Sequence, residues 1–246
     1  MARIGIIGGE GRMGRAIALA LADGGHDLAG AVDRGGDVAA LADASEALVD
    51  FSAPGALQHN LHAAIGAGIP ILVGTTGLAE EHHRAIDRAA QAVAVLQTGN
   101  TSPGVTLLSA LVRDAARRLG PDWDIEIVEM HHRGKVDAPS GTALLLGAAA
   151  AEGRGVALDD VAQRARDGET GARGHGTIGF ASLRGGTVAG EHSVIFAGDE
   201  ERLTLSHHAE NRSIFARGAV RAAEWLIARA PGRYTMEDVL GLDRRA

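Results

Sequence analysis

Short apolar runs alternate with longer amphipathic segments through the first hundred residues of this chain. Five of these runs predict buried strands, at residues 4–7, 27–32, 48–51, 69–73 and 93–97. Three intervening segments have helical periodicity and predict helices, at residues 12–23, 54–66 and 78–91. Apolar strands that alternate with helices are typical of a parallel sheet covered on both faces. We therefore predict a doubly wound α/β domain.

The pattern changes after Pro103. A helix is predicted over residues 104–119, followed by a strand over 123–130 and a helix over 142–151. The stretch 168–209 is rich in glycine and alternates Thr, Val, Ile and Phe, which predicts the antiparallel or mixed strands of a second, α+β domain. Its strands are expected at residues 177–180, 188–196 and 202–206.

The last part of the chain returns to helical periodicity. One helix is predicted over residues 213–230, and Thr235 with Asp238 forms a capping box that predicts a final short helix. We expect this C-terminal segment to pack back on the first domain. The predicted domains are therefore residues 1–102 with 213–246, and residues 103–212.

The composition agrees with this architecture and excludes several functions. Hydrophobic residues make up 46% of the chain and aromatic residues only 3%, so the core is expected to consist of Ala, Val, Leu and Ile. Such a core suits helices packed on a parallel sheet. The chain has no cysteine, which excludes disulfides, thiol catalysis and thiolate metal sites. A net charge of −7 argues against general binding to nucleic acid or to membrane surfaces.

The sequence contains no recognisable signal for export or membrane insertion. The first residues enter a strand pattern directly, without a charged segment, an apolar core and a cleavage site. No apolar run reaches the roughly 18 residues of a membrane span. We expect a cytoplasmic protein with neither nucleic-acid nor membrane partners.

A glycine-rich turn, Gly8 to Gly14, follows the first predicted strand and opens the first predicted helix. Asp33 closes the second strand about 20 residues later, where a Rossmann-type dinucleotide site places its ribose-binding acid. A glycine turn alone is weak evidence, because such turns also serve as ordinary tight connections. The strand before it, the helix after it and Asp33 together favour a dinucleotide site in a Rossmann-type domain.

Two further polar turns follow later strands of this domain, Gly74-Thr75-Thr76-Gly77 and Thr98-Gly99-Asn100-Thr101-Ser102. Open α/β sheets bind ligands outside the carboxyl ends of their strands, so both turns are positioned to contact a cofactor. The alternative interpretation is that each turn is a plain connection between a strand and a helix.

The stretch from Glu129 to Thr142 carries the strongest candidate chemistry. It contains His131, His132 and Lys135, which is the only lysine in the chain. A lysine ammonium can change its pKa or donate a proton, which arginine does not imitate. Ser140-Gly141-Thr142 opens a predicted helix, whose N-terminus favours a carboxylate. These features predict a site for a small dicarboxylate, with one of the two histidines as general acid.

Each histidine pair also has a simpler interpretation. Adjacent histidines at the end of a strand point to opposite faces, which applies to residues 131–132 and to His207-His208. His82 and His83 lie on a charged predicted helix and are expected to face solvent. Neither an HExxH motif nor a His and Cys spacing occurs, so we predict no metal site.

The stretch from Glu129 to Ala143 closely resembles the signature of the 4-hydroxy-tetrahydrodipicolinate reductase family, the dihydrodipicolinate reductases of bacterial lysine and diaminopimelate synthesis. The resemblance extends over nearly the whole chain. Gly8 to Gly14 is similar to the family's GxxGRMG loop, and residues 74–77 to its GTTG turn. Further segments resemble the strands of the substrate domain and the closing pattern: Ile178-Gly179-Phe180, Arg184-Gly185-Gly186, Gly190-Glu191-His192, His207-His208-Ala209 and Phe215-Ala216-Arg217-Gly218-Ala219.

The resemblance implies reduction of an unsaturated cyclic dicarboxylate by hydride from C4 of a nicotinamide. It implies that His131 is the acid or base, and that Lys135 donates a proton or a hydrogen bond to the ring nitrogen. Four residues would hold the substrate carboxylates: His132, Ser140, Gly141 and Thr142. The implied residues for NADH or NADPH are Gly8, Gly9, Glu10, Gly11, Arg12, Met13, Asp33, Arg34, Gly74, Thr75, Thr76, Thr98, Gly99, Asn100 and Thr101.

The resemblance also implies an assembly. Family members are commonly tetramers joined through the sheet of the substrate domain. Residues 103–212 would then serve both substrate binding and oligomerisation, and residues 1–102 with 213–246 would bind the dinucleotide. We expect a homotetramer.

One departure from the family pattern concerns the cofactor. Many relatives have Asn-Phe-Ser where this chain has Asn100-Thr101-Ser102, which removes an aromatic contact near the nicotinamide. Asp33 favours a free 2′-hydroxyl, whereas Arg34 suits a 2′-phosphate. We expect use of both NADH and NADPH, with a preference for NADH.

Two other functions remain open. The chain would fit another nicotinamide-dependent oxidoreductase that acts on a different small acid, or a nucleotide-binding module without catalysis. The pair of His131 and Lys135 argues against the module, since a sensor needs no proton donor.

Overall fold

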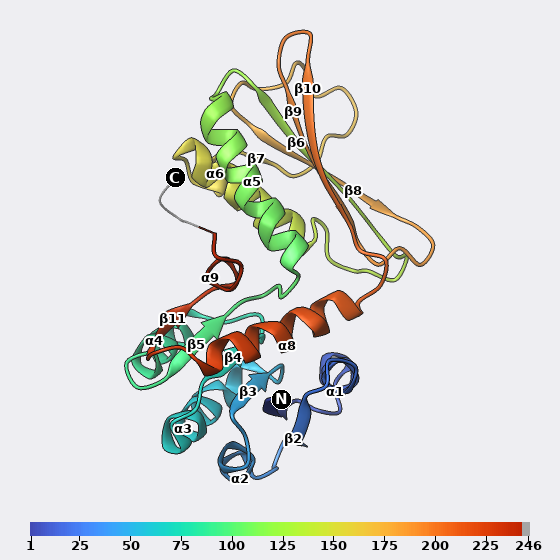
Figure 1. Ribbon diagram of the computed structural model, residues 1–246. Helices are drawn as coiled ribbons and strands as arrows, with labels where there is room; N and C mark the ends of the chain where they lie inside the picture. Colours follow the sequence, from blue (N-terminus) through green and yellow to red (C-terminus); the bar gives the residue numbers. More distant parts are fainter. Residues whose placement is uncertain (243–246) are drawn as a thin grey trace. The chain divides into compact units, whose positions relative to one another are not determined.

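The computed structural model describes residues 1–242 of the chain and contains two compact units (Figure 1). The first unit consists of Met1–Pro103 and the chain from Ser213 onward, and the second unit consists of Gly104–Arg212. The chain thus passes into the second unit after Pro103, one residue later than the predicted boundary. The functions predicted for the two segments stay predictions at this point.

The first unit is built on a six-stranded sheet with the order β11-β5-β4-β3-β1-β2, in which every pairing is parallel. Its strands are β1 (Arg3–Ile7), β2 (Asp27–Val32), β3 (Ala47–Asp50), β4 (Ile71–Val73), β5 (Ala94–Gln97) and β11 (Gly232–Tyr234). The predicted Rossmann-type class of this unit is confirmed. The sequence pattern missed β11 because a strand of three residues is too short to establish an alternation.

Helices cover both faces of this sheet (Figure 1). The helical elements are α1 (Arg12–Asp23), α2 (Val38–Asp43), the 3-10 turn η1 (Pro54–Ala56), α3 (Leu57–Ala67), α4 (Glu80–Ala89), α8 (Ser213–Ile227) and α9 (Met236–Leu240). Apolar residues of α1 and α8 pack on one face, and those of α2, α3 and α4 on the other. The predicted helix over 54–66 begins instead as a 3-10 turn at Pro54. Helix α2 was missed because its six residues are too few for a helical period.

Two smaller expectations for this unit concern the starts of α9 and α4. Thr235 donates its backbone N–H to the Asp238 carboxylate at 2.7 Å, as expected for the start of α9. His82 does not simply face solvent, because its Nδ1 accepts the Ala79 backbone N–H at 2.9 Å and so caps α4. That correction follows from position, since an imidazole in the first helical turn can reach a free backbone N–H.

The second unit contains a mixed five-stranded sheet with the order β10-β9-β6-β8-β7. Its strands are β6 (Asp124–His131), β7 (Ala162–Gln163), β8 (Ile178–Arg184), β9 (Glu191–Ala197) and β10 (Arg202–His208), and its helices are α5 (Pro103–Leu119), α6 (Gly141–Arg154) and α7 (Leu158–Val161). Strand β6 pairs parallel with β8 and antiparallel with β9, so the sheet is mixed, as the pattern allowed. Apolar residues of α5 and α6 pack on one face of the sheet.

The central strand of this sheet, β6, alternates strictly between covered and partly exposed side chains. Ile125 and Ile127 point into the core beneath the helices. Because side chains two residues apart lie on the same face of a strand, Glu129 and His131 continue this buried row. Two ionisable groups thus occupy positions of core type, and they need polar partners there.

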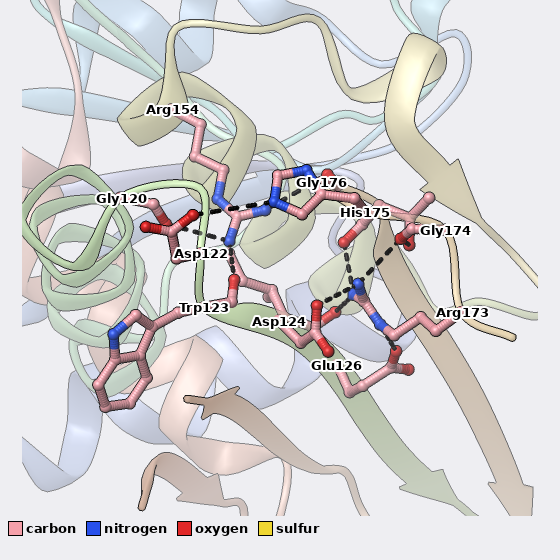
Figure 2. A network of polar contacts seen from close by, with 12 residues as sticks. Gly120, Asp122, Trp123, Asp124, Glu126, Arg154, Arg173, Gly174, His175 and Gly176 are labelled. Carbon is pink, nitrogen blue, oxygen red and sulfur yellow. Dashed lines mark hydrogen bonds and ion pairs between the residues drawn. The ribbon is translucent and has the colours of Figure 1, made fainter. Parts of the chain in front are cut away.

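The opposite face and the beginning of β6 carry a different arrangement, of which Figure 2 shows the contacts of Arg154 and Arg173. Arg166 donates two hydrogen bonds of 2.9 Å to the Glu126 carboxylate, and Arg173 connects Glu126 at 2.9 Å with Asp124 at 2.6 Å. Arg154 lies close by and donates to the carbonyl oxygens of residues 120, 123 and 176. These arginines fasten the connections around the N-terminal end of the strand.

Two kinds of feature are missing from residues 1–242. No helix in this part of the chain is both long and apolar enough to span a membrane. Over the same residues, no three His, Asp or Glu side chains gather in a way that would hold a metal ion.

Candidate active site

The glycine turn after β1 has a geometry that only glycine permits. Gly8 has a positive φ of 89°, and a Cβ at Gly14 would collide with the carbonyl oxygen of Gly8. The N-cap of α1 is Gly11, so no side chain occupies the first free N–H groups of this helix. A helix N-terminus exposed beside a close glycine turn is suited to a pyrophosphate.

A cavity of about 760 Å³ opens beside this turn. Four of the predicted cofactor residues line it, namely Gly8, Gly11, Asp33 and Arg34. The Asp33 carboxylate accepts the backbone N–H of Glu10 at 2.9 Å, which ties the end of β2 to the glycine turn. Apolar side chains that include Val38 and Phe51 complete the wall, so the cavity fits the mixed polarity of an adenosine. Gly9, Arg12 and Met13 do not line it.

A buried carboxylate forms hydrogen bonds with residues that line this cavity. Asp50, at the end of β3, is fully buried and accepts hydrogen bonds from the Ser52 backbone N–H at 2.9 Å and hydroxyl at 2.6 Å. It also accepts from Asn60 Nδ2 at 2.9 Å and from the Thr75 hydroxyl at 3.4 Å. Ser52 and Asn60 both line the cavity, so Asp50 joins two parts of its wall to the turn after β4. Sequence reasoning had placed Asp50 only as a strand residue.

The two predicted turns after β4 and β5 lie at the carboxyl edge of the same parallel sheet. Their side chains are largely used within the fold. Thr75 is buried against Asp50, and the Thr98 hydroxyl bonds within its own turn to the Asn100 carbonyl at 2.8 Å. A Cβ at Gly74 would collide with the Phe51 ring. These turns therefore offer backbone to a ligand more than they offer side chains.

Thr101, which stands in place of the expected aromatic residue, is 2% exposed. Its hydroxyl donates to the carbonyl oxygen of Phe215 in the first turn of α8 at 2.7 Å. A Cβ at Gly218 would collide with the Thr101 carbonyl oxygen, so the turn lies directly against α8. The Thr101 hydroxyl thus attaches the turn after β5 to a helix.

In the second unit, the predicted catalytic stretch gathers around a residue for which no role was predicted. Glu129 is 1% exposed, and its Oε2 forms a hydrogen bond of 2.5 Å with Nδ1 of His131. Arg184 at the end of β8 donates to both carboxylate oxygens at 2.8 Å. The backbone N–H of Ser140 donates to Oε1 at 3.2 Å. One carboxylate therefore joins the proposed acid, an arginine and the start of α6.

These contacts settle the charge of the carboxylate. Burial alone would raise the pKa of Glu129, but the hydrogen bonds from Arg184 and His131 outweigh it and lower the pKa to about 2. Glu129 is therefore ionised at neutral pH. An ionised carboxylate only accepts hydrogen bonds, so Nδ1 of His131 must carry a proton.

The N-terminus of α6 is organised by a second histidine that sequence reasoning did not single out for a role. The Ser140 hydroxyl accepts the Ala143 backbone N–H at 3.1 Å and lies 3.0 Å from Nε2 of His192. Burial, and to a smaller extent the nearby charge of His131, lower the pKa of His192 to about 4. A Cβ at Gly141 would meet nothing within 4 Å, so this helix start is open on that side.

Lys135 and His132 lie in the loop between β6 and α6 and have different partners. Lys135 Nζ is 2.8 Å from the Asp137 carboxylate, and this contact lowers the pKa of Asp137. His132 Nε2 is 2.8 Å from the Arg212 guanidinium, and both residues line a cavity of about 570 Å³. The structure thus connects His131 with Ser140 through Glu129, whereas His132 faces a separate arginine.

Both parts of the chain match models of one family. The model described as "Dihydrodipicolinate reductase, N-terminus" matches residues 2–101, and "Dihydrodipicolinate reductase, C-terminus" matches residues 104–240. The two matches meet at the passage between the two units.

Whole-chain comparisons give the same result. A protein of Zymomonas mobilis named 4-hydroxy-tetrahydrodipicolinate reductase is 54% identical over 98% of this chain and 97% of its own length. One of Parvibaculum lavamentivorans with the same name is 52% identical over 98% of each chain. Among solved structures, a dipicolinate-bound dihydrodipicolinate reductase from Paenisporosarcina sp. TG-14 shares the fold with a TM-score of 0.76 at 23% identity, over 96% of this chain and 97% of its own.

Proposed function

The chain belongs to the dihydrodipicolinate reductase family, and on this premise we propose that it reduces 4-hydroxy-tetrahydrodipicolinate to tetrahydrodipicolinate in lysine and diaminopimelate biosynthesis. Its chemistry makes it an oxidoreductase that uses a nicotinamide dinucleotide. The observation that carries the proposal is the joining of His131 to the Ser140 helix start by Glu129. This places a proton-handling imidazole beside a carboxylate-binding N-terminus in one unit.

Loss of the substrate's 4-hydroxyl as water gives an unsaturated ring, and the reduction adds one hydride and one proton to that ring. The bound dinucleotide supplies the hydride from C4 of its nicotinamide, and the protein must supply the proton. We assign the proton to His131 and Lys135, with Lys135 donating a proton or a hydrogen bond at the ring nitrogen. The contact of Lys135 with Asp137 holds the ammonium in place within the loop that ends at Ser140.

The substrate's carboxylates are assigned to the start of α6. Ser140, Gly141 and Thr142 stand at the positive end of a 14-residue helix, where the Ser140 N–H is already donated to Glu129 and the backbone that follows it faces the ligand. Gly141 leaves room for a close approach, and His132 with Arg212 adds positive or donating groups on the other side of the loop. We infer that a small dicarboxylate binds there.

The glycine turn and the 760 Å³ cavity of the first unit are assigned to the dinucleotide. We infer dual use of NADH and NADPH with a preference for NADH, because Asp33 is held in place by the Glu10 N–H while Arg34 lines the same cavity. The ratio of kcat/KM for the two cofactors tests this. Arg34→Ala is expected to lower the NADPH value selectively, and equal losses with both cofactors would contradict the assignment.

The assembly is also proposed. Strand β10 exposes most of its residues, and Leu183 and Leu203 on the sheet of the second unit are 51% and 40% exposed. Apolar groups on an open sheet face favour association, and we propose a cytoplasmic homotetramer joined through this sheet. Light scattering is expected to give four times the 25.2 kDa of one chain.

The decisive experiment for the function is turnover by the wild-type protein. NADH or NADPH is expected to be oxidised only when the product of the preceding aldolase-type synthase is present. Oxidation with a different small acid in its place would indicate another oxidoreductase. Tight NADH binding without turnover of any substrate would instead favour the nucleotide-binding module.

A further inference from the structure

We propose that Glu129, clamped by Arg184, is a positioning residue that sets the tautomer and proton affinity of His131. This inference rests on the proposed function only where it concerns turnover. Its structural part, the state of the imidazole, stands on the contacts of three side chains from two neighbouring strands. Nothing in the sequence signature alone assigns a role to this pair.

The Glu129 carboxylate accepts hydrogen bonds from several donors. Arg184 donates to both oxygens, Ser140 donates its backbone N–H to Oε1, and Nδ1 of His131 contacts Oε2. A guanidinium is always protonated, so its two bonds require acceptors on the carboxylate. A proton on Nδ1 is then the only arrangement that satisfies the 2.5 Å contact between His131 and Glu129.

The other ring nitrogen of His131, Nε2, has different surroundings. With Nδ1 protonated, Nε2 of His131 is free to hold or release the second proton. A Cβ at Gly190 would lie 3.0 Å from Nε2, so the glycine keeps this nitrogen clear of side-chain contact. The reactive proton therefore belongs on Nε2, and the Glu129 carboxylate stabilises the doubly protonated imidazolium from the far side.

Arg184 also contacts the loop between β6 and α6. Besides Glu129, it donates to the carbonyl oxygen of Asp137 at 2.7 Å, within the loop that carries Lys135. Glu129 in turn receives the Ser140 N–H where that loop ends. One ion pair thus holds both the imidazole and the loop between β6 and α6.

The charges that face His131 come from every element around it. They are Glu129 on β6, Arg184 on β8 and His192 on β9, and the ion pair of Lys135 with Asp137 lies in the loop that follows β6. The ring of His192 packs edge-on against that of His131 at a centroid distance of 5.1 Å and adds no charge while it is neutral. Arg184 and Lys135 oppose a proton on His131. Glu129 is in direct contact with the ring and favours that proton, so its removal is expected to dominate.

The test is Glu129→Gln, read first by nitrogen NMR of the His131 ring. The wild-type ring is expected to carry its proton on Nδ1 when neutral, and the variant to shift toward the Nε2–H tautomer, because a glutamine amide can donate to Nδ1. With turnover as second readout, kcat is expected to fall roughly 100-fold while KM for NADH stays within about twofold. The alkaline limb of the kcat profile should move to lower pH, since the proton on His131 loses its stabilising charge.

Glu126→Gln is the matched control. It makes the same change on the same strand, on the opposite face and away from His131, and it is expected to leave tautomer, pH profile and kcat unchanged. Glu129→Asp, which keeps the charge on a shorter side chain, is expected to restore the alkaline limb in part. A wild-type tautomer and an unmoved pH profile in Glu129→Gln would overturn the proposal, even if activity fell.

Two further results, a Glu129→Gln variant that does not fold and a wild-type protein without turnover, can be told apart from a failure of the proposal. If Glu129→Gln does not fold, Arg184→Lys replaces the two-pronged contact by a single one, and an unchanged His131 spectrum and pH profile there would equally refute the role of the clamp. If the wild-type protein shows no turnover, the proposed function fails. The tautomer measurement still confirms or refutes the positioning of His131.

Discussion

Both termini of β6 carry a glutamate paired with arginine, but the two pairs have different roles. At its beginning, Glu126 binds Arg166 and, as Figure 2 shows, Arg173 on a partly exposed face, where the network fastens surface connections. At its end, Glu129 binds Arg184 on the buried face and also holds His131. An exposed ion pair contributes little to stability, whereas a buried pair is costly to break. Burial, and not residue type, distinguishes the structural end of the strand from the proposed chemical end.

The largest effect is expected from Lys135→Ala, in the loop that follows the buried end. Loss of the ammonium removes a proton or hydrogen-bond donor, and we expect kcat to fall roughly 100-fold to 1,000-fold. The dissociation constant for NADH, measured by nucleotide fluorescence, should stay nearly the same, because Lys135 and the glycine turn belong to different units. Lys135→Arg keeps the charge and serves as the control for electrostatics alone. Full activity in Lys135→Ala would refute the assignment.

Arg184→Met probes the buried end through stability. The substitution leaves the Glu129 carboxylate, 1% exposed, without its guanidinium partner. Breaking one side of a buried pair costs about 3 to 5 kcal/mol, and since the Arg184 side chain is 22% exposed we expect roughly 3 kcal/mol of unfolding free energy. Urea denaturation measures this loss. A change below about 1 kcal/mol would place the pair in the same class as the exposed network.

The pH dependence of stability separates the two ends as well. The folded pKa of His192, about 4, lies below its ordinary value of 6.5, so the unfolded chain takes up a proton first as the pH falls. Stability is therefore lost between pH 6.5 and 4, and we expect roughly 2 kcal/mol less unfolding free energy at pH 5 than at pH 7. Glu129, with its pKa lowered to about 2, adds a loss only below about pH 4.5.

His192→Gln is the variant that checks this. It keeps a polar group near the Ser140 hydroxyl and removes the titration, so the difference between pH 7 and pH 5 should shrink. Glu126, whose carboxyl pKa is lowered by its two arginines against the effect of burial, cannot produce a loss that begins above pH 5. An undiminished loss in His192→Gln would assign the acid sensitivity to other residues.

The sequence predicts the elements of this fold better than it predicts the contacts at the buried end. His131, Lys135 and Ser140 stand close together in the chain, so their association was visible in the spacing. Arg184 lies 55 residues beyond Glu129, and it reaches the site because it pairs in register with His131 across the parallel β6 and β8. Register depends on the assembled sheet, which no local pattern specifies.

Some signal for the missed residues was nevertheless present. Ile125, Ile127 and Glu129 share one face of a predicted strand, and a charged residue in a buried row requires a partner. That reasoning finds Glu129 but not its arginine. Asp50 in the first unit is a similar case, because its partners Ser52 and Asn60 converge only after the 3-10 turn at Pro54 has formed.

The smallest effect is expected at the exposed end, from Arg173→Met. This substitution removes the contacts to Glu126, Asp124 and three carbonyl oxygens, but Arg166 still neutralises Glu126. We expect a loss of roughly 1 kcal/mol in unfolding free energy, with kcat and the pH profile unchanged. Urea denaturation of Arg173→Met beside Arg184→Met makes the comparison direct. Because both changes remove an arginine from a glutamate on β6, equal losses would mean that burial does not separate the two ends, and a fall in kcat for Arg173→Met would mean that the network acts on the site.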